Sequence, residues 1–279
     1  MYKKTIGSTA AKSAKAGMRT ARNVTLASTL VSAMTVLLVG CGGGGSDSPA
    51  PATASGPSAE GVYGGTLTGS TLNRDFQMLV LETGEVWALY GAQGGGQFGV
   101  AGFIQGSGSS SNGNFTSPDT RDFGFSPAIS GSTKASYDAT AKTVAGTVTW
   151  PSGAVSFNGG PVAGSLYDYN KPAALSTIAG VWSATSVTGE RISLNLAASG
   201  TLTANSNLGC NFSGTVTPRP SGKNVFNVAL TFGTAPCALA GQGASGIALA
   251  YPLANGKTQL LMVAVDGTRQ YGSAAFATR

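Results

Sequence analysis

The chain of 279 residues contains no histidine, only three cysteines and few charged residues, which make up 10% of it. Without histidine it lacks the commonest general base, so a Ser/His/Asp or Cys/His nucleophile system is excluded. The same absence disfavours a metal site, because few soft or nitrogen ligands remain. We therefore predict a non-enzymatic protein with no catalytic residues, no cofactor and no metal.

Two carboxylate pairs leave one catalytic alternative. Glu82 and Glu85 flank a predicted hairpin turn, and Asp119 and Asp122 flank Arg121. A converging pair of carboxylates can hydrolyse glycosides. Charged residues at hairpin tips are usually solvated, and we favour that interpretation. The glycine clusters lack the following Lys-Ser/Thr and helix of a phosphate-binding loop, so they are interpreted as loops.

Helical periodicity is also missing beyond residue 58, where short alternating segments are separated by turn residues. In residues 192–196, Ile and Leu alternate with Ser and Asn, as in a half-buried antiparallel strand. Hairpins are predicted over residues 76–90 and 192–203. Further strands are expected near residues 102–106, 114–116, 132–137, 144–150, 154–157, 162–167, 210–216, 225–232, 245–251, 259–265 and 271–277. This pattern predicts an all-β fold of two tandem small antiparallel β-barrels or sandwiches.

The N-terminus carries six basic residues, then an apolar stretch over residues 24–40 that ends in Leu38-Val39-Gly40 before Cys41. Seventeen residues interrupted by Ser and Thr are short and polar for the alternative, a membrane-spanning helix. The succession resembles the signal peptide and lipobox of bacterial lipoproteins. The resemblance implies recognition of Leu38, Val39 and Gly40 by the signal peptidase, cleavage before Cys41 and acylation of that cysteine.

Acyl chains on Cys41 would make the membrane a partner of the chain. In that family the residue after the cysteine influences sorting, and Gly42 is not the aspartate that commonly retains lipoproteins in the inner membrane. The expected location is therefore the outer membrane, on its periplasmic face or at the cell surface. The Gly/Pro/Ala/Ser/Thr-rich residues that follow, to about residue 58, are typical of a flexible tether.

The charge balance changes when the signal peptide is removed. The whole chain is formally +6, but residues 42–279 hold 11 basic and 11 acidic side chains, so no nucleic-acid partner is expected. Residues 60–174 are net −3 and residues 175–279 are net +4. This asymmetry indicates either a dipolar surface that orients a partner or sequence drift.

The predicted domains follow from these features. Gly61-Val62-Tyr63 and Gly180-Val181-Trp182 begin two similar halves, each with an early hairpin. The predicted order is a signal peptide (1–40), an acylated cysteine and tether (41–59), an N-terminal β domain (60–170), a linker (171–177) and a C-terminal β domain (178–279). Cys210 and Cys237 lie 27 positions apart in an exported chain, so a structural disulfide is expected, with two buried free thiols as the alternative.

Aromatic residues suggest a binding site in the first half. Most of them should be core, but an exposed set could stack on sugars or anchor a protein partner. The candidates are Tyr90, Phe98, Tyr167 and Tyr169.

Two further resemblances bear on function. Gly180-Val181-Trp182 resembles the Gly-x-Trp opening of lipocalins, where the aromatic closes the base of a barrel. The tethered, glycine-rich, two-part β architecture resembles surface lipoproteins such as transferrin-binding protein B and factor H-binding protein. We therefore hypothesise a lipoprotein that presents a binding surface to an unknown protein or glycan partner. The alternative is a lipocalin-like carrier of a small apolar ligand.

Overall fold

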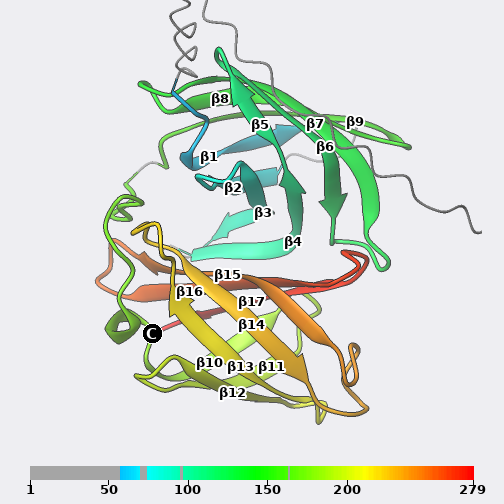
Figure 1. Ribbon diagram of the computed structural model, residues 1–279, viewed down its shortest axis with the longest axis vertical. Coiled ribbons are helices and arrows are strands. Elements are labelled where there is room, and N and C mark those ends of the chain that lie inside the picture. Colours follow the sequence, from blue (N-terminus) through cyan, green and yellow to red (C-terminus); the bar gives the residue numbers. More distant parts are fainter. Residues whose placement is uncertain (1–56, 70–73, 95–96, 163) are drawn as a thin grey trace, which may run out of the picture. The chain divides into compact units, whose positions relative to one another are not determined.

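The computed structural model describes residues 57–69, 74–94, 97–162 and 164–279 (Figure 1). Leu38, Val39, Gly40 and Cys41 lie outside this described part, so the lipobox stays a prediction. No helix in the described ranges is long and apolar enough to cross a membrane. All the strands fall within residues 51–279, which form one compact unit.

The first barrel contains nine antiparallel strands between residues 61 and 160. The sheet order is β4-β3-β2-β1-β9-β8-β7-β6-β5, and pairing of β4 with β6 at Ile104↔Asp122 and Gln105↔Arg121 closes an eight-stranded ring. The short β5 extends only from β6. The strands are β1 Gly61–Thr68, β2 Arg74–Val80, β3 Glu85–Gly94, β4 Gln97–Ser107, β5 Ser109–Ser111, β6 Asn114–Asp122, β7 Ile129–Asp138, β8 Thr143–Trp150 and β9 Gly153–Gly160.

The second barrel is an up-and-down ring in which each strand pairs with its neighbour along the chain. It closes where β10 pairs with β17, at Thr185↔Phe276. A 3₁₀ turn, η1 Leu175–Thr177, precedes it. The strands are β10 Gly180–Ser186, β11 Arg191–Leu196, β12 Thr201–Ser206, β13 Asn211–Pro218, β14 Phe226–Phe232, β15 Gly243–Pro252, β16 Thr258–Asp266 and β17 Gly272–Thr278.

The prediction of two tandem small β-barrels is confirmed, because each sheet closes into a ring. Side chains alternate between barrel interior and solvent, as the sequence indicated. In β11, Ile192, Leu194 and Leu196 are buried, while Ser193 and Asn195 are exposed. The interior of a barrel of this size is filled by such side chains.

The predicted strand over residues 162–167 is wrong. The backbone turns there instead: Ser165 N–H donates to the carbonyl of Val162, and Gly164 has a φ of 67°, in the left-handed region that glycine adopts without strain. Beyond this turn the Tyr167 ring stacks on Tyr251, with ring centroids 5.4 Å apart. The segment therefore crosses from one barrel to the other without joining a sheet.

An apolar layer joins the outer faces of the two barrels. Trp87 and Phe103 from β3 and β4 belong to one buried cluster with Leu261, Val263 and Val265 of β16. Strand β16 is buried on both faces, since its alternate residues, such as Leu260 and Met262, fill the second barrel. This explains its uninterrupted apolar sequence. The two barrels consequently share one buried apolar cluster, which is separate from the core inside each barrel.

Three ion pairs also cross between the barrels, each from an acidic residue of the first half to a basic residue of the second. Glu60 pairs with Lys223 at 2.6 Å, Glu82 with Arg219 at 2.7 Å and Asp119 with Arg269 at 2.6 Å. The opposite net charges of the two halves therefore complement each other within the chain. An external partner is not needed to explain them.

The carboxylates of two of these pairs have lowered pKa values. Burial alone would raise the pKa of Glu82, but the hydrogen bond from Arg219 and further donors outweigh it. Burial opposes the shift at Asp119 in the same way, and the Ser107 N–H and Arg269 together bring the pKa of that carboxyl below its usual range. Both charges are therefore favoured in the folded protein.

Acid should weaken the contact between the barrels. The pKa values of Glu82 and Asp119 are lower in the folded protein than in the unfolded chain, where they are about 4. The two carboxylates therefore stabilise the folded protein fully above about pH 4, and this stabilisation is lost as the pH falls through their folded pKa values. The free energy of unfolding, measured by urea denaturation, should decline below about pH 4. The double variant Glu82→Gln/Asp119→Asn should be about 0.5–2 kcal/mol less stable at neutral pH and show a shallower decline. An identical acid dependence in the variant would contradict this role.

Candidate functional site

A cavity of about 450 Å³ lies at one end of the second barrel. Strand pairs β10–β11, β12–β13, β14–β15 and β16–β17 are joined by turns at this end. Interior side chains of the barrel form the wall of the cavity, among them Leu194, Leu230 and Met262. The partly buried rings of Phe212 and Phe232 lie 5.3 Å apart beside them. We call this cavity and its rim the mouth.

The opposite end of the barrel is closed. The Trp182 side chain is 2% exposed, and its indole N–H donates to the carbonyl of Ile178 at 2.7 Å. The guanidinium of Arg279 lies 3.9 Å from the centre of the indole ring, at the distance of a cation–π contact. Trp182 and Arg279 thus close this end of the barrel.

The rim of the mouth concentrates exposed apolar side chains. Phe125, Leu208 and Tyr271 are 56%, 67% and 43% exposed, and all three line the cavity. Two other large apolar side chains in the described ranges are exposed, Leu166 and Val181, and neither lines it. Apolar side chains gathered around a concave site mark a place of binding more strongly than the same residues scattered singly.

Side-chain acceptors fix three turns of the rim. The Ser186 hydroxyl accepts hydrogen bonds from the N–H groups of Thr188 and Glu190, and the Ser206 hydroxyl accepts from Leu208 and Cys210. The carboxylate of Asp266 accepts from the N–H groups of its own turn, including that of Tyr271 at 2.7 Å. Burial alone would raise the pKa of Asp266, but hydrogen bonds from the Thr268 hydroxyl and from these N–H groups together lower it, so the carboxylate stays charged. The rim residues are therefore held in place before any ligand arrives.

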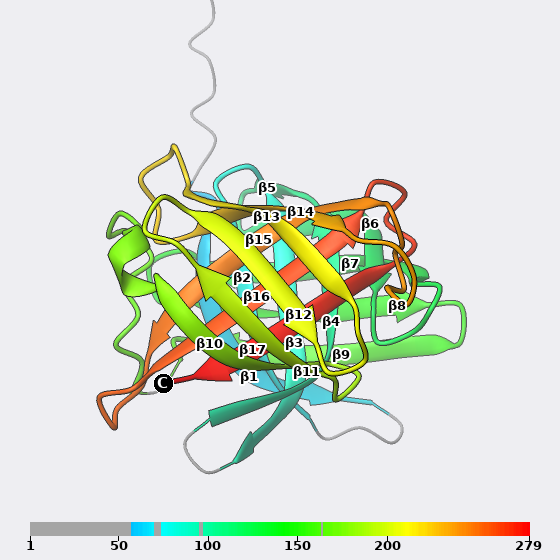
Figure 2. The same ribbon diagram turned by 90° about the horizontal axis from the view of Figure 1, so that it is seen from below.

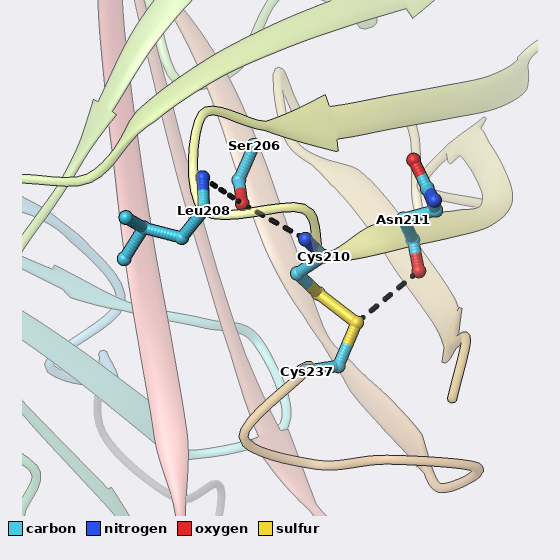
Figure 3. Close-up of a disulfide and its surroundings, with 5 residues drawn as sticks. All are labelled: Ser206, Leu208, Cys210, Asn211 and Cys237. Carbon is cyan, nitrogen blue, oxygen red and sulfur yellow. Dashed lines mark hydrogen bonds between the residues drawn. A yellow bond between two sulfur atoms is a disulfide. The ribbon is translucent and has the colours of Figure 1, made fainter. Parts of the chain in front are cut away.

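The disulfide fixes the fourth turn (Figure 3). Cys210 and Cys237 are bonded, which confirms the predicted pairing and links the start of β13 to the loop over residues 233–242. That loop contributes Pro236 and Leu239 to the cavity lining. The Cys237 sulfur also lies 3.4 Å from the carbonyl oxygen of Asn211. The bridge consequently shapes one wall of the mouth.

The first barrel supplies the remaining wall through the loop between β6 and β7. Phe123 stacks on Phe103 with centroids 4.8 Å apart, and Phe125 reaches the cavity two residues later. The carboxylate of Asp122 holds this loop, because it accepts the N–H of Gly124 and the hydroxyl of Tyr90, each at 2.8 Å. Burial raises the pKa of Asp122, and these two hydrogen bonds only partly offset that effect.

Two glycines permit the close packing around this loop. A Cβ at Gly124 would lie 1.8 Å from the Tyr90 hydroxyl within the first barrel, and a Cβ at Gly272 of the second barrel would lie 2.8 Å from the rings of both Phe103 and Phe123. The mouth is therefore a site of both barrels.

Electrostatically the mouth is nearly neutral. Glu190 is the one charged side chain among its lining residues. The lining hydroxyls of Ser186 and Ser206 already accept hydrogen bonds from the rim turns. An apolar group is consequently the best match for the interior, with any polar group of a ligand left at the rim.

The aromatic residues predicted to bind a ligand do not form an exposed platform. Phe98 is 2% and Tyr169 8% exposed, and both belong to the apolar layer between the barrels. Tyr167 packs on Tyr251, and its hydroxyl donates to the carbonyl of Asn224. Tyr90 is half-buried and acts on the mouth indirectly, through Asp122. Their positions are corrected accordingly: all four contribute to the packing or positioning of the barrels.

The carboxylate pairs do not converge on one site. Glu82 binds Arg219 and Asp119 binds Arg269, while Glu85 accepts the side-chain amide of Gln105 and Asp122 accepts Tyr90. Within the described ranges, no group of three or more His, Cys, Asp or Glu residues could hold a metal ion.

Sequence reasoning missed the rim residues Phe125, Leu208 and Tyr271. One signal could have drawn attention to them: each is a large apolar residue within or beside a turn rich in Gly, Ser, Asn or Thr, as in Ser206-Asn207-Leu208-Gly209. A turn offers no core contact to such a residue, so its position suggests another use.

Comparison with known proteins adds little. No family model matches the chain, and no curated protein matches it. Two solved structures match weakly: isotype 1 transferrin-binding protein B from serogroup B Neisseria meningitidis, and a protein of unknown function of the DUF3598 family from Nostoc punctiforme.

The first match is 9% identical at a TM-score of 0.25, and it covers 74% of this chain and 65% of the other, so the chain spans about two thirds of that protein's length. The second is 10% identical at a TM-score of 0.23 and covers 78% and 93%. Scores this low carry no argument, and the fold assignment depends on strand order and register alone.

Removing the disulfide should destabilise the protein and loosen the mouth. The chain-entropy model gives about 3.5 kcal/mol for a loop of this length. The variant Cys210→Ser/Cys237→Ser should therefore lose about 3–4 kcal/mol in urea denaturation, and hydrogen exchange should accelerate first in residues 233–242. Unchanged exchange in that loop would show that the bridge does not hold the wall of the mouth.

Proposed function

We propose that this chain is a lipid-anchored, non-enzymatic binding protein of the bacterial envelope, and that the mouth of its second barrel takes up a small apolar ligand. The observation that carries the proposal is the apolar cavity of about 450 Å³ whose rim holds three of the exposed large apolar side chains. Ligand cavities in proteins usually measure about 300–1,000 Å³ and are lined mainly by apolar groups.

The geometry favours the carrier over a flat surface that recognises a folded protein. The cavity is concave and its floor is made of interior side chains of the barrel, so a ligand would rest on apolar surface surrounded by the rim. A chain-like apolar group would lie against Leu194, Leu230 and Met262, and its polar end would remain near the Ser and Thr residues of the rim. Burial of each CH₂ contributes about 0.8 kcal/mol, so a medium-length chain suffices for micromolar affinity.

The preorganised rim supports the same proposal. Side-chain acceptors and the disulfide fix the four turns that surround the mouth. Loops that are already ordered lose little conformational entropy on binding, which raises affinity.

Binding is tested with residues 51–279, which contain every strand of both barrels. Native mass spectrometry of the purified protein should detect a co-purified small molecule, and a fluorescent fatty acid should bind with saturation. The rim variant Phe125→Ser/Leu208→Ser should bind the probe about tenfold or more weakly, because it removes two apolar contacts. The matched control Leu166→Ser/Val181→Ser replaces equally exposed apolar residues away from the cavity and should bind normally. An empty protein that never saturates with the probe, or equal losses in both variants, would end the proposal.

The anchor is tested separately in cells. The predicted acylation of Cys41 requires its thiol, so Cys41→Ser should abolish lipid attachment and leave an unprocessed chain of larger mass. The parent chain should fractionate with outer membranes and be extracted by detergent. Mass spectrometry of the N-terminal peptide provides the readout: a parent chain with an unmodified Cys41 would contradict the anchor without affecting the binding proposal.

A further inference from the structure

The outer face of strands β11–β14 is polar and, apart from Arg191 at the start of β11, uncharged. These strands lie side by side in Figure 2. From Ser193 to Leu196 and through β12–β14, the exposed positions are Ser, Thr or Asn apart from Ala229 and Pro218, and none is charged. Solvated sheet faces usually carry charges, which also protect them from association. We call this surface the polar face.

The strand register sets the side chains of the polar face in rows. Ser193 lies opposite Asn205, which lies opposite Asn211. Neighbouring strands are about 4.8 Å apart, so the three side chains form a continuous line across β11, β12 and β13.

A second row runs parallel to the first. It passes from Asn195 to Thr203, Ser213 and Thr231, each opposite the next on the adjacent strand. The two rows are separated by two residues along each strand, roughly 7 Å. Together they present hydroxyl and carboxamide groups in a regular array.

The array lines a hollow of about 500 Å³ on the outside of the barrel. No hydrogen bond within the described part of the chain engages the side chains of Asn195, Asn205 or Asn211, so their amides are available to a ligand. Phe212 and Phe232 contribute to the floor of the hollow, but their side chains pack against the core inside the barrel. The hollow therefore offers mainly free hydrogen-bond donors and acceptors.

The asparagines indicate a binding role more strongly than the serines and threonines do, because asparagine is disfavoured in strands. Asn has low β-propensity, whereas Thr fits an exposed strand position well. Asn205 and Asn211 nevertheless stand directly opposite each other. A carboxamide offers two donors and one acceptor at fixed positions, a capacity that a strand does not need for its own stability.

We propose that the polar face binds a neutral oligosaccharide chain. Sugar hydroxyls both donate and accept hydrogen bonds, as do the hydroxyl and carboxamide groups of the two rows. The absence of charge in the hollow matches a neutral ligand and gives no attraction to a nucleic acid or another polyanion. The hollow lies on the outer face of the barrel, whereas the mouth lies at its end, and the two sites share only Phe212 and Phe232 in their linings.

The test uses residues 51–279 and neutral tetrasaccharides of glucose, N-acetylglucosamine and mannose, titrated by isothermal calorimetry and nuclear magnetic resonance. At least one should bind and shift amide signals of β11–β14. Asn205→Ala, at the centre of the first row, should weaken binding about fivefold to tenfold, as expected for a lost hydrogen bond. Thr201→Ala lies on the same strand and face, outside the hollow, and should bind like the parent protein.

Each other outcome would overturn the proposal. No binding of any of the three tetrasaccharides means that the hollow is not a neutral glycan site. Equal binding by the parent and Asn205→Ala places the glycan elsewhere. A dimer that forms through this face, and that Asn205→Ala disrupts, assigns the face to a second copy of the chain. Fatty-acid binding at the mouth, measured on the same samples, separates these results from a failure of the proposed carrier function.

Discussion

The apolar layer between the two barrels is the contact on which the rest of the structure depends. It forms because β3 and β4 carry apolar residues on their outer faces, including Trp87, and because β16 is apolar on both. Neither barrel could expose that surface to water without a large loss of stability. Three ion pairs surround the layer and contribute orientation more than energy, since partly exposed pairs stabilise by about 1 kcal/mol or less each.

This layer also determines the position of the proposed ligand site. It brings the β6–β7 loop of the first barrel to the open end of the second, where Phe125 completes the rim. Gly272 permits the close approach, and Asp122 holds the loop through Tyr90 and Gly124. The polar face lies on other strands of the second barrel, β11–β14, which take no part in the layer. One barrel thus offers two chemically distinct surfaces.

The sequence predicts local structure here better than contacts between distant segments. Alternation in residues 192–196 identifies β11 and its inward face, and the two lone cysteines identify the disulfide. The apolar run of β16 predicts a buried strand, but no feature of that segment indicates that its second face packs against another barrel. For the same reason Phe98 and Tyr169 could be taken for exposed ligand-binding residues, although segments far away in the chain bury them. The mouth was missed because its rim comes from four separate turns and a loop of the other barrel.

The most direct test of the account is a crystal structure of residues 51–279 with a bromine-labelled fatty acid. We predict an anomalous bromine signal at the mouth of the second barrel, beside Leu230 and Met262, with Phe125 and Leu208 in contact with the ligand at the rim. A barrel whose mouth contains only water at saturating ligand, or bromine bound solely elsewhere, would contradict the account.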